Sequence, residues 1–206
     1  MKKWSDVFWA LVLIFASNGA HAGQAVVTSL LEIRHENVVI QKWDLSCGAA
    51  ALATILRYQY REPVTEKDIA VALMQRQVYV QHPELIRIRQ GFSLLDLKRY
   101  TDLTGHSGVA YGNLDLKNLI DMAPVMVPVK VLGYNHFVVF RGVVANRVLL
   151  ADPAWGNRTM LVTDFIESWI DFPAIGRVGF VVKRRDGSKM PANGLSMRNV
   201  DFVMLK

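Results

Sequence analysis

The residue pattern changes at Pro124, and this change limits the folds that the chain can adopt. Beyond Pro124, β-branched and aromatic residues dominate four runs that are separated by Gly, Asn and Pro, as is typical of strands. The runs are VMVPVKVL (125–132), HFVVFRGVV (136–144), RVLLAD (147–152) and RVGFVVKR (177–184). A small helix is expected over 164–170, between the last two runs. The second half of the chain therefore predicts an antiparallel sheet.

Before Pro124 the pattern is helical. Small apolar residues over 47–58 suit a closely packed helix, after a short strand over 38–40. Thr65 with Asp68, and Ser93 with Asp96, resemble capping boxes at helix starts. They open helices that run through Met74 and over 94–103, and a further helix is expected over 116–121. Helices first and an antiparallel sheet second indicate an α+β fold.

The composition fits one globular domain behind an export signal. Of the 206 residues 51% are hydrophobic and 20% are charged, and no repeat or long linker divides the chain. Lys2 and Lys3 precede an apolar run over 7–16, and Ala20-His21-Ala22 offers a cleavage point. The run is shorter than the roughly 20 residues that span a bilayer. We expect a cleaved signal peptide over 1–22 and a domain over 23–206, with an uncleaved N-terminal anchor as the alternative.

Positive charge gathers near the C-terminus. The net charge is +6, and much of it lies in a basic segment, 183–206, which follows the expected domain core at about 38–182. The segment also contains Gly187, Pro191 and Gly194, so a solvated loop or tail is expected. Contact with anionic lipid head groups or an acidic partner is the alternative. Aromatic residues do not alternate with the basic ones, which argues against nucleic-acid binding.

Cys47 is the only cysteine in the chain, so it has no partner for an intrachain disulfide. Most free cysteines are small buried hydrophobes. The alternative is a reactive thiol, and the sequence position favours it. Cys47 starts the expected helix 47–58, where unpaired N–H groups and the helix dipole stabilise a thiolate.

His136 and Asp152 are expected to be neighbours. If the chain turns near residues 144–146, position 136 lies across from a residue in the low 150s. Pro153 cannot donate to a strand ladder, so the strand should end at Asp152 and leave its carboxylate at an edge. An imidazole and a carboxylate then share one end of the sheet.

These residues fit the roles of nucleophilic catalysis. A cysteine nucleophile needs a general base, and the base needs an orienting group; Cys47, His136 and Asp152 supply these three roles. The Cys47 backbone N–H and the Gln41 side-chain amide are the candidate donors to an oxyanion. Ser46 also carries a hydroxyl, but we expect it to cap the helix rather than to act as nucleophile.

Other residues give weaker indications. Trp155 follows Asp152 in a loop and is a candidate for contact with substrate. The histidines at 35, 82 and 106 have no partner at metal-ligand spacing, so neither a metal nor another cofactor is expected.

The segments QKWDLSCGAAALATIL, NHFVVF and ADPAWG resemble the papain-like cysteine peptidases that cut bacteriocin leaders after a double glycine. In that family a Gln lies six residues before a Cys-Gly, and an Asp-Pro follows sixteen residues after a His. Gln41, Cys47, His136 and Asp152 keep these spacings, and the match runs from about 40 to 156. Two features depart from the family: Ser46 stands where Asp is common, and we expect a stand-alone exported peptidase, whereas most members are fused to a transporter.

The resemblance implies a papain-like peptidase fold, with N-terminal helices packed on a C-terminal antiparallel sheet. It implies an endopeptidase that cuts a polypeptide after small residues such as Gly-Gly, and the expected signal peptide over 1–22 places this activity in the periplasm after export. Secreted or fibril-forming clients of a functional-amyloid export system, and components of that system, are the expected partners. A peptidase-like module that binds and escorts an export client without cutting it is the alternative.

Overall fold

The computed structural model describes residues 29–188, 194–196, 198 and 205. The predicted signal peptide over 1–22 lies outside these residues. The helices are α1 (Leu30–His35), α2 (Cys47–Tyr60), α3 (Glu66–Met74), α4 (Gln77–Gln81), α5 (Leu85–Ile88), α6 (Leu94–Leu103), α7 (Leu116–Met122) and α8 (Val162–Ser168). The strands are β1 (His106–Tyr111), β2 (Val125–Val131), β3 (Tyr134–Val144), β4 (Arg147–Asp152), β5 (Gly156–Leu161), β6 (Asp171–Phe172), β7 (Gly176–Arg177) and β8 (Gly179–Arg184).

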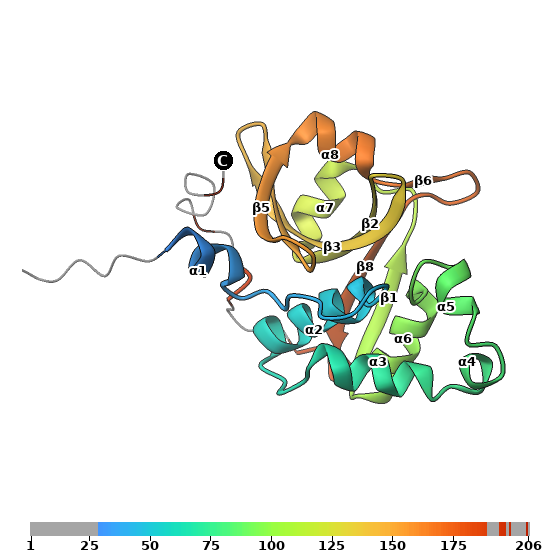
Figure 1. Cartoon of the computed structure of the whole chain (residues 1–206). Helices are drawn as coiled ribbons and strands as arrows, with labels where there is room; N and C mark the ends of the chain where they lie inside the picture. Colours follow the sequence, from blue (N-terminus) through green and yellow to red (C-terminus); the bar gives the residue numbers. More distant parts are fainter. Residues whose placement is uncertain (1–28, 189–193, 197, 199–204, 206) are drawn as a thin grey trace, which may run out of the picture.

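An antiparallel sheet organises the molecule, with strand order β1-β8-β2-β3-β4-β5. Strands β2 to β5 curve around α7, and α8 contacts both β2 and β5 (Figure 1). On the other side, α2 packs on β3 and α6 packs on β1. The α+β architecture with helices before a C-terminal antiparallel sheet is confirmed.

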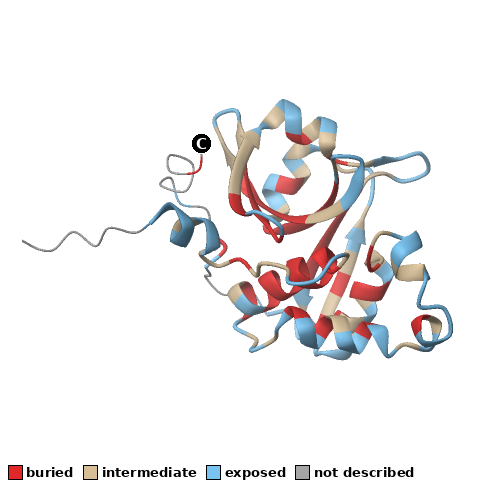
Figure 2. Cartoon of the chain, viewed as in Figure 1, coloured by how far each residue is buried: buried red, intermediate tan, exposed pale blue. Residues whose placement is uncertain are grey.

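Helix α2 is the centre of the helical layer. Twelve of its fourteen residues are buried, because the helix lies between the sheet and the neighbouring helices (Figure 2). Small alanines allow this close approach. A Cβ on Gly48 would lie 3.2 Å from both Leu97 and Phe137, so glycine at this position lets α2 approach α6 and β3.

The predicted capping boxes exist. Thr65 with Asp68 caps α3, and Ser93 with Asp96 caps α6. The helix expected over 164–170 begins and ends two residues earlier, as α8. Strands β1 and β5 were not predicted, since β1 contains Gly108 and half of the residues of β5 are polar.

Two sequence predictions are wrong. Residues 38–40 form no strand, because their backbone groups bond elsewhere: the N–H of Val39 donates to the Thr54 hydroxyl. The basic segment is not wholly a solvated tail. Lys183 and Arg184 end β8, which agrees with the strand run over 177–184, but further along Leu195 is buried, with its carbonyl accepting a hydrogen bond from Arg141.

Candidate active site

Cys47 is the first residue of α2, and only 5% of its surface is exposed. Its backbone N–H therefore belongs to the first turn of the helix, where N–H groups lack partners within the helix. Ser46 occupies the N-cap position but its side chain makes no capping hydrogen bond, which corrects the expected role. The Ser46 hydroxyl instead lies 2.6 Å from the carbonyl oxygen of Trp43 and also contacts Glu66.

The hairpin of β3 and β4 brings His136 and Asp152 together. The two strands pair from Val144 with Arg147 to Val139 with Ala151, so both residues lie at the far end of the hairpin from its turn. His136 Nε2 lies 2.7 Å from Asp152 Oδ1. The predicted proximity of His136 and Asp152 is confirmed.

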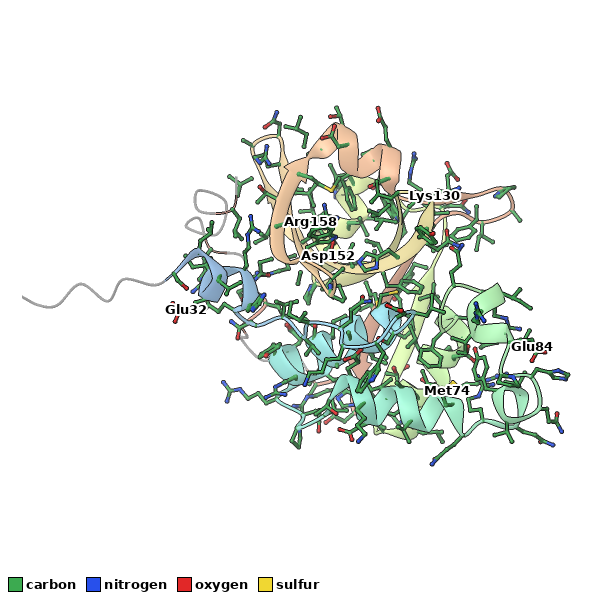
Figure 3. The ribbon with its side chains drawn as sticks, in the orientation of Figure 1. Glu32, Met74, Glu84, Lys130, Asp152 and Arg158 are labelled. Atoms are coloured by element: carbon green, nitrogen blue, oxygen red, sulfur yellow. The ribbon has the colours of Figure 1, made fainter. Side chains whose placement is uncertain are left out.

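Asp152 is completely buried, and its carboxylate is surrounded by donors. Oδ1 accepts the N–H of Ala154 at 2.9 Å, and Oδ2 accepts the Nε–H of Arg158 at 2.8 Å. Figure 3 labels Arg158 and Asp152, which lie side by side within the arc of the sheet. Sequence reasoning missed Arg158 because it assigned no strand to 156–161. In β5, Arg158 pairs with Leu150 of β4. Since side chains alternate along a strand, Leu150 and Asp152 share a face, and Arg158 lies on that face too.

The electrostatics of the pair favour a protonated imidazole. Burial by itself would lower the pKa of His136, but hydrogen bonds to Asp152 and Cys47 and their negative charges outweigh burial and raise this pKa to about 9. Burial would likewise raise the pKa of Asp152, but His136, Arg158 and the N–H of Ala154 together hold it below its usual value. Because Nε2 is bonded to Asp152, the ring nitrogen left for Cys47 is Nδ1.

Gln41 lies on the irregular segment that leads into α2. Its backbone N–H donates to the Pro153 carbonyl at 2.8 Å, next to Asp152. Its side-chain Nε2 donates to the Trp43 carbonyl at 3.3 Å, which uses one of the two amide hydrogens. Its Oε1 is buried and has no hydrogen-bond partner among the residues that the structure describes.

A mostly apolar cavity of about 570 Å³ lies at the start of β3, and neither Cys47 nor His136 lines it. Asn135 and Phe137, which flank His136 on β3, both line it. Its other lining residues include Phe92, Leu94, Pro128, Phe172 and Ile175. Trp155 does not line this cavity; it is 61% exposed, and its N–H donates to the Asp152 carbonyl.

Within the described residues, no group of three or more His, Cys, Asp or Glu side chains could hold a metal ion. No helix in that part of the chain is both long and apolar enough to span a membrane.

The model of the peptidase C39 family matches residues 35–173. "Probable functional amyloid protease FapD" of Pseudomonas aeruginosa is 38% identical over 154 residues, which cover 73% of this chain and 66% of that protein. The protein of the same name in Pseudomonas fluorescens is 39% identical over 152 residues, covering 73% and 65%. The chain thus spans just under two thirds of the length of these curated relatives.

Two solved structures share the fold. A double glycine motif protease from an AMS/PCAT transporter, in complex with the leader peptide, has a TM-score of 0.56 at 21% identity and covers 73% of this chain and 95% of its own. The peptidase domain of Streptococcus ComA, a bi-functional ABC transporter involved in a quorum sensing pathway, has a TM-score of 0.57 at 18% identity, covering 73% and 100%. These similarities confirm the expected peptidase fold.

Proposed function

The chain belongs to the peptidase C39 family, and from this premise we propose that it is a cysteine endopeptidase with Cys47 as nucleophile, His136 as proton carrier and Asp152 as orienting group. The observation that carries the proposal is that His136 interacts with both Asp152 and Cys47. Its Nε2 is held by Asp152 at 2.7 Å, and its other ring nitrogen is available to Cys47.

In the first half of the reaction, the Cys47 thiolate attacks the carbonyl carbon of the scissile peptide bond. The carbonyl electrons move onto oxygen, and the resulting oxyanion accepts hydrogen bonds from the Cys47 N–H and the free amide hydrogen of Gln41. The C–N bond then breaks, and the departing amine takes the proton of His136 Nδ1. Asp152 stabilises the imidazolium and fixes the ring.

In the second half, neutral His136 accepts a proton from a water molecule that attacks the thioester. The C–S bond breaks, the new carboxyl product leaves, and Cys47 and His136 return to their starting state. Every proton removed in one half is returned in the other, so these residues complete the cycle without a cofactor.

The substrate class that we propose is an extended polypeptide cut after small residues such as Gly-Gly. The burial of Cys47 supports small side chains at the cut, and the apolar cavity lined by Asn135 and Phe137 supports apolar side chains further away. The amyloid-protease relatives support secreted or fibril-forming clients, and the leader-like sequence at 1–22 supports export to the periplasm.

The test is cleavage of synthetic peptides that differ only at the cut, with Gly-Gly, Ala-Ala or Leu-Leu, followed by mass spectrometry. Product from the Gly-Gly peptide, lost in Cys47→Ala, supports the proposal. Peptide binding without cleavage by the unmodified protein would instead support an escort function. Fractionation of cells that carry a tagged full chain tests the location, and retention in the cytoplasm would contradict export.

A further inference from the structure

Glu66 is a buried carboxylate that the proposed mechanism does not use. It is the first residue of α3, and only 3% of its surface is exposed. Both of its carboxylate oxygens lie 3.0 Å from the backbone nitrogen of Lys42, and Oε1 also contacts the Ser46 hydroxyl. Its hydrogen bonds therefore go to the segment 41–46, which connects Gln41 to Cys47.

Such a burial requires compensation. A carboxylate taken out of water is strongly destabilising unless donors surround it. Here the compensation comes from the Lys42 N–H, the Ser46 hydroxyl and the positive end of the α3 dipole. The side chain thus joins α3 to the segment before Cys47, two parts of the chain that are twenty or more residues apart.

The contacts continue from Glu66 to Gln41. The Ser46 hydroxyl has one proton to share between Glu66 and the Trp43 carbonyl, which lies 2.6 Å away. The same Trp43 carbonyl accepts the Gln41 Nε2–H. At its other end the segment is fixed by the bond from the Gln41 N–H to Pro153.

We propose that Glu66 is a positioning residue that holds residues 41–46 in place, so that Gln41 presents its free amide hydrogen to the oxyanion. This inference rests on the peptidase function proposed above. Gln41 sits on irregular backbone, where no strand ladder fixes it, so its placement depends on its backbone bond to Pro153 and on these side-chain bonds. Small displacements of an oxyanion donor weaken its bond in the transition state more than they weaken substrate binding.

The experiment compares two reagents for Cys47. A peptide aldehyde ending in glycyl-glycinal forms a C–S bond with Cys47, and its carbonyl oxygen becomes a hydroxyl or oxyanion at the oxyanion site. Iodoacetamide alkylates the Cys47 sulfur with loss of iodide, and this reaction needs no oxyanion donor. Glu66→Gln and Ser46→Ala are the test variants. Glu62→Gln is the matched control, since the Glu62 side chain is 44% exposed and faces His106 instead.

We expect the aldehyde affinity to fall about tenfold in Glu66→Gln and in Ser46→Ala, and kcat to fall by a similar factor with KM nearly unchanged. The rate of alkylation should stay within about twofold of the unmodified protein, and Glu62→Gln should match it in every assay. A general loss of structure would slow both reagents together.

The inference is overturned if both variants bind the aldehyde as tightly as Glu62→Gln does, or if alkylation slows in parallel with aldehyde binding. Failure of the underlying function is recognised separately. In that case the unmodified protein itself neither cleaves Gly-Gly peptides nor binds the aldehyde, which overturns both proposals before any variant is compared.

Discussion

His136 Nε2 and Asp152 Oδ1 lie 2.7 Å apart, although sixteen residues separate them in the chain. The β3–β4 hairpin places them at one end of the sheet, and the pair is shielded from water: the side chain of His136 is 13% exposed and that of Asp152 is not exposed. The bond fixes the ring so that Nδ1 is the nitrogen left for Cys47.

Asp152→Ala should lower kcat/KM by roughly 100-fold or more, because the imidazole loses its orienting acceptor. Asp152→Asn keeps an oxygen that can accept the Nε2–H, so its loss should be smaller, about tenfold. Initial rates with a Gly-Gly peptide measure both effects. Asp121→Asn, on the exposed side of α7, is the control. Equal losses of kcat/KM in the Ala and Asn variants would show that activity does not depend on an oxygen that accepts the His136 Nε2–H.

The alkaline limb of activity should lie near pH 9. In the proposed mechanism protonated His136 supplies the proton to the leaving amine, and the pKa of His136 is raised to about 9 rather than lying near 6.5. Activity that depends on the charged ring is therefore retained through neutral pH and lost as the pH rises through about 9. In Asp152→Asn the negative charge that raises this pKa is gone, so the limb should move to lower pH. The measurement is the profile of kcat/KM against pH for both proteins. Coinciding alkaline limbs in the unmodified protein and in Asp152→Asn would contradict this prediction.

The sequence was informative where local signals and chain spacing determine structure. The residues before Cys47-Gly48 and the strand run up to Asp152 sufficed to place Cys47 at a helix start and His136 beside Asp152. The tertiary contacts that hold these site residues in place could not be predicted from local signals. Glu66 reaches the segment 41–46 only through the packing of α3.

The irregular segments show the same limit. Residues 38–40 carry β-branched side chains but bond to a helix side chain instead of a strand, which local propensity does not reveal. The role of Ser46 was misjudged for a related reason. An N-cap is a local preference, and here the tertiary contacts with Trp43 and Glu66 take the hydroxyl.

Arg158→Met should destabilise the fold by about 2 kcal/mol, because Asp152 Oδ2 would remain buried without its charged partner. The Arg158 side chain is 30% exposed, so water can replace part of the lost interaction. Arg147→Met is the matched control on β4, since Arg147 bonds to Thr159 and not to a carboxylate. Urea unfolding of both variants gives the comparison. Equal changes in the free energy of unfolding would contradict a special role for the Arg158–Asp152 pair.

Gly156→Ala should destabilise the protein by roughly 2–4 kcal/mol through the contact between β5 and α1. Gly156 has φ +80°, a conformation that strains an alanine, and a Cβ there would overlap the carbonyl oxygen of Arg34 and lie 3.3 Å from the His35 ring. Gly105 has nearly the same φ, +82°, but no atom of the described part of the chain lies within 4 Å of its notional Cβ.

Gly105→Ala should therefore lower the free energy of unfolding by about 1 kcal/mol, through backbone strain alone. The difference between the two variants then measures the steric overlap at position 156. Urea unfolding measures both variants. If Gly156→Ala costs no more than Gly105→Ala, then α1 can move away from β5 without loss. In that case the hydrogen bonds of Asn157 Nδ2 to the carbonyls of Ile33 and Glu36 do not anchor α1 to the sheet.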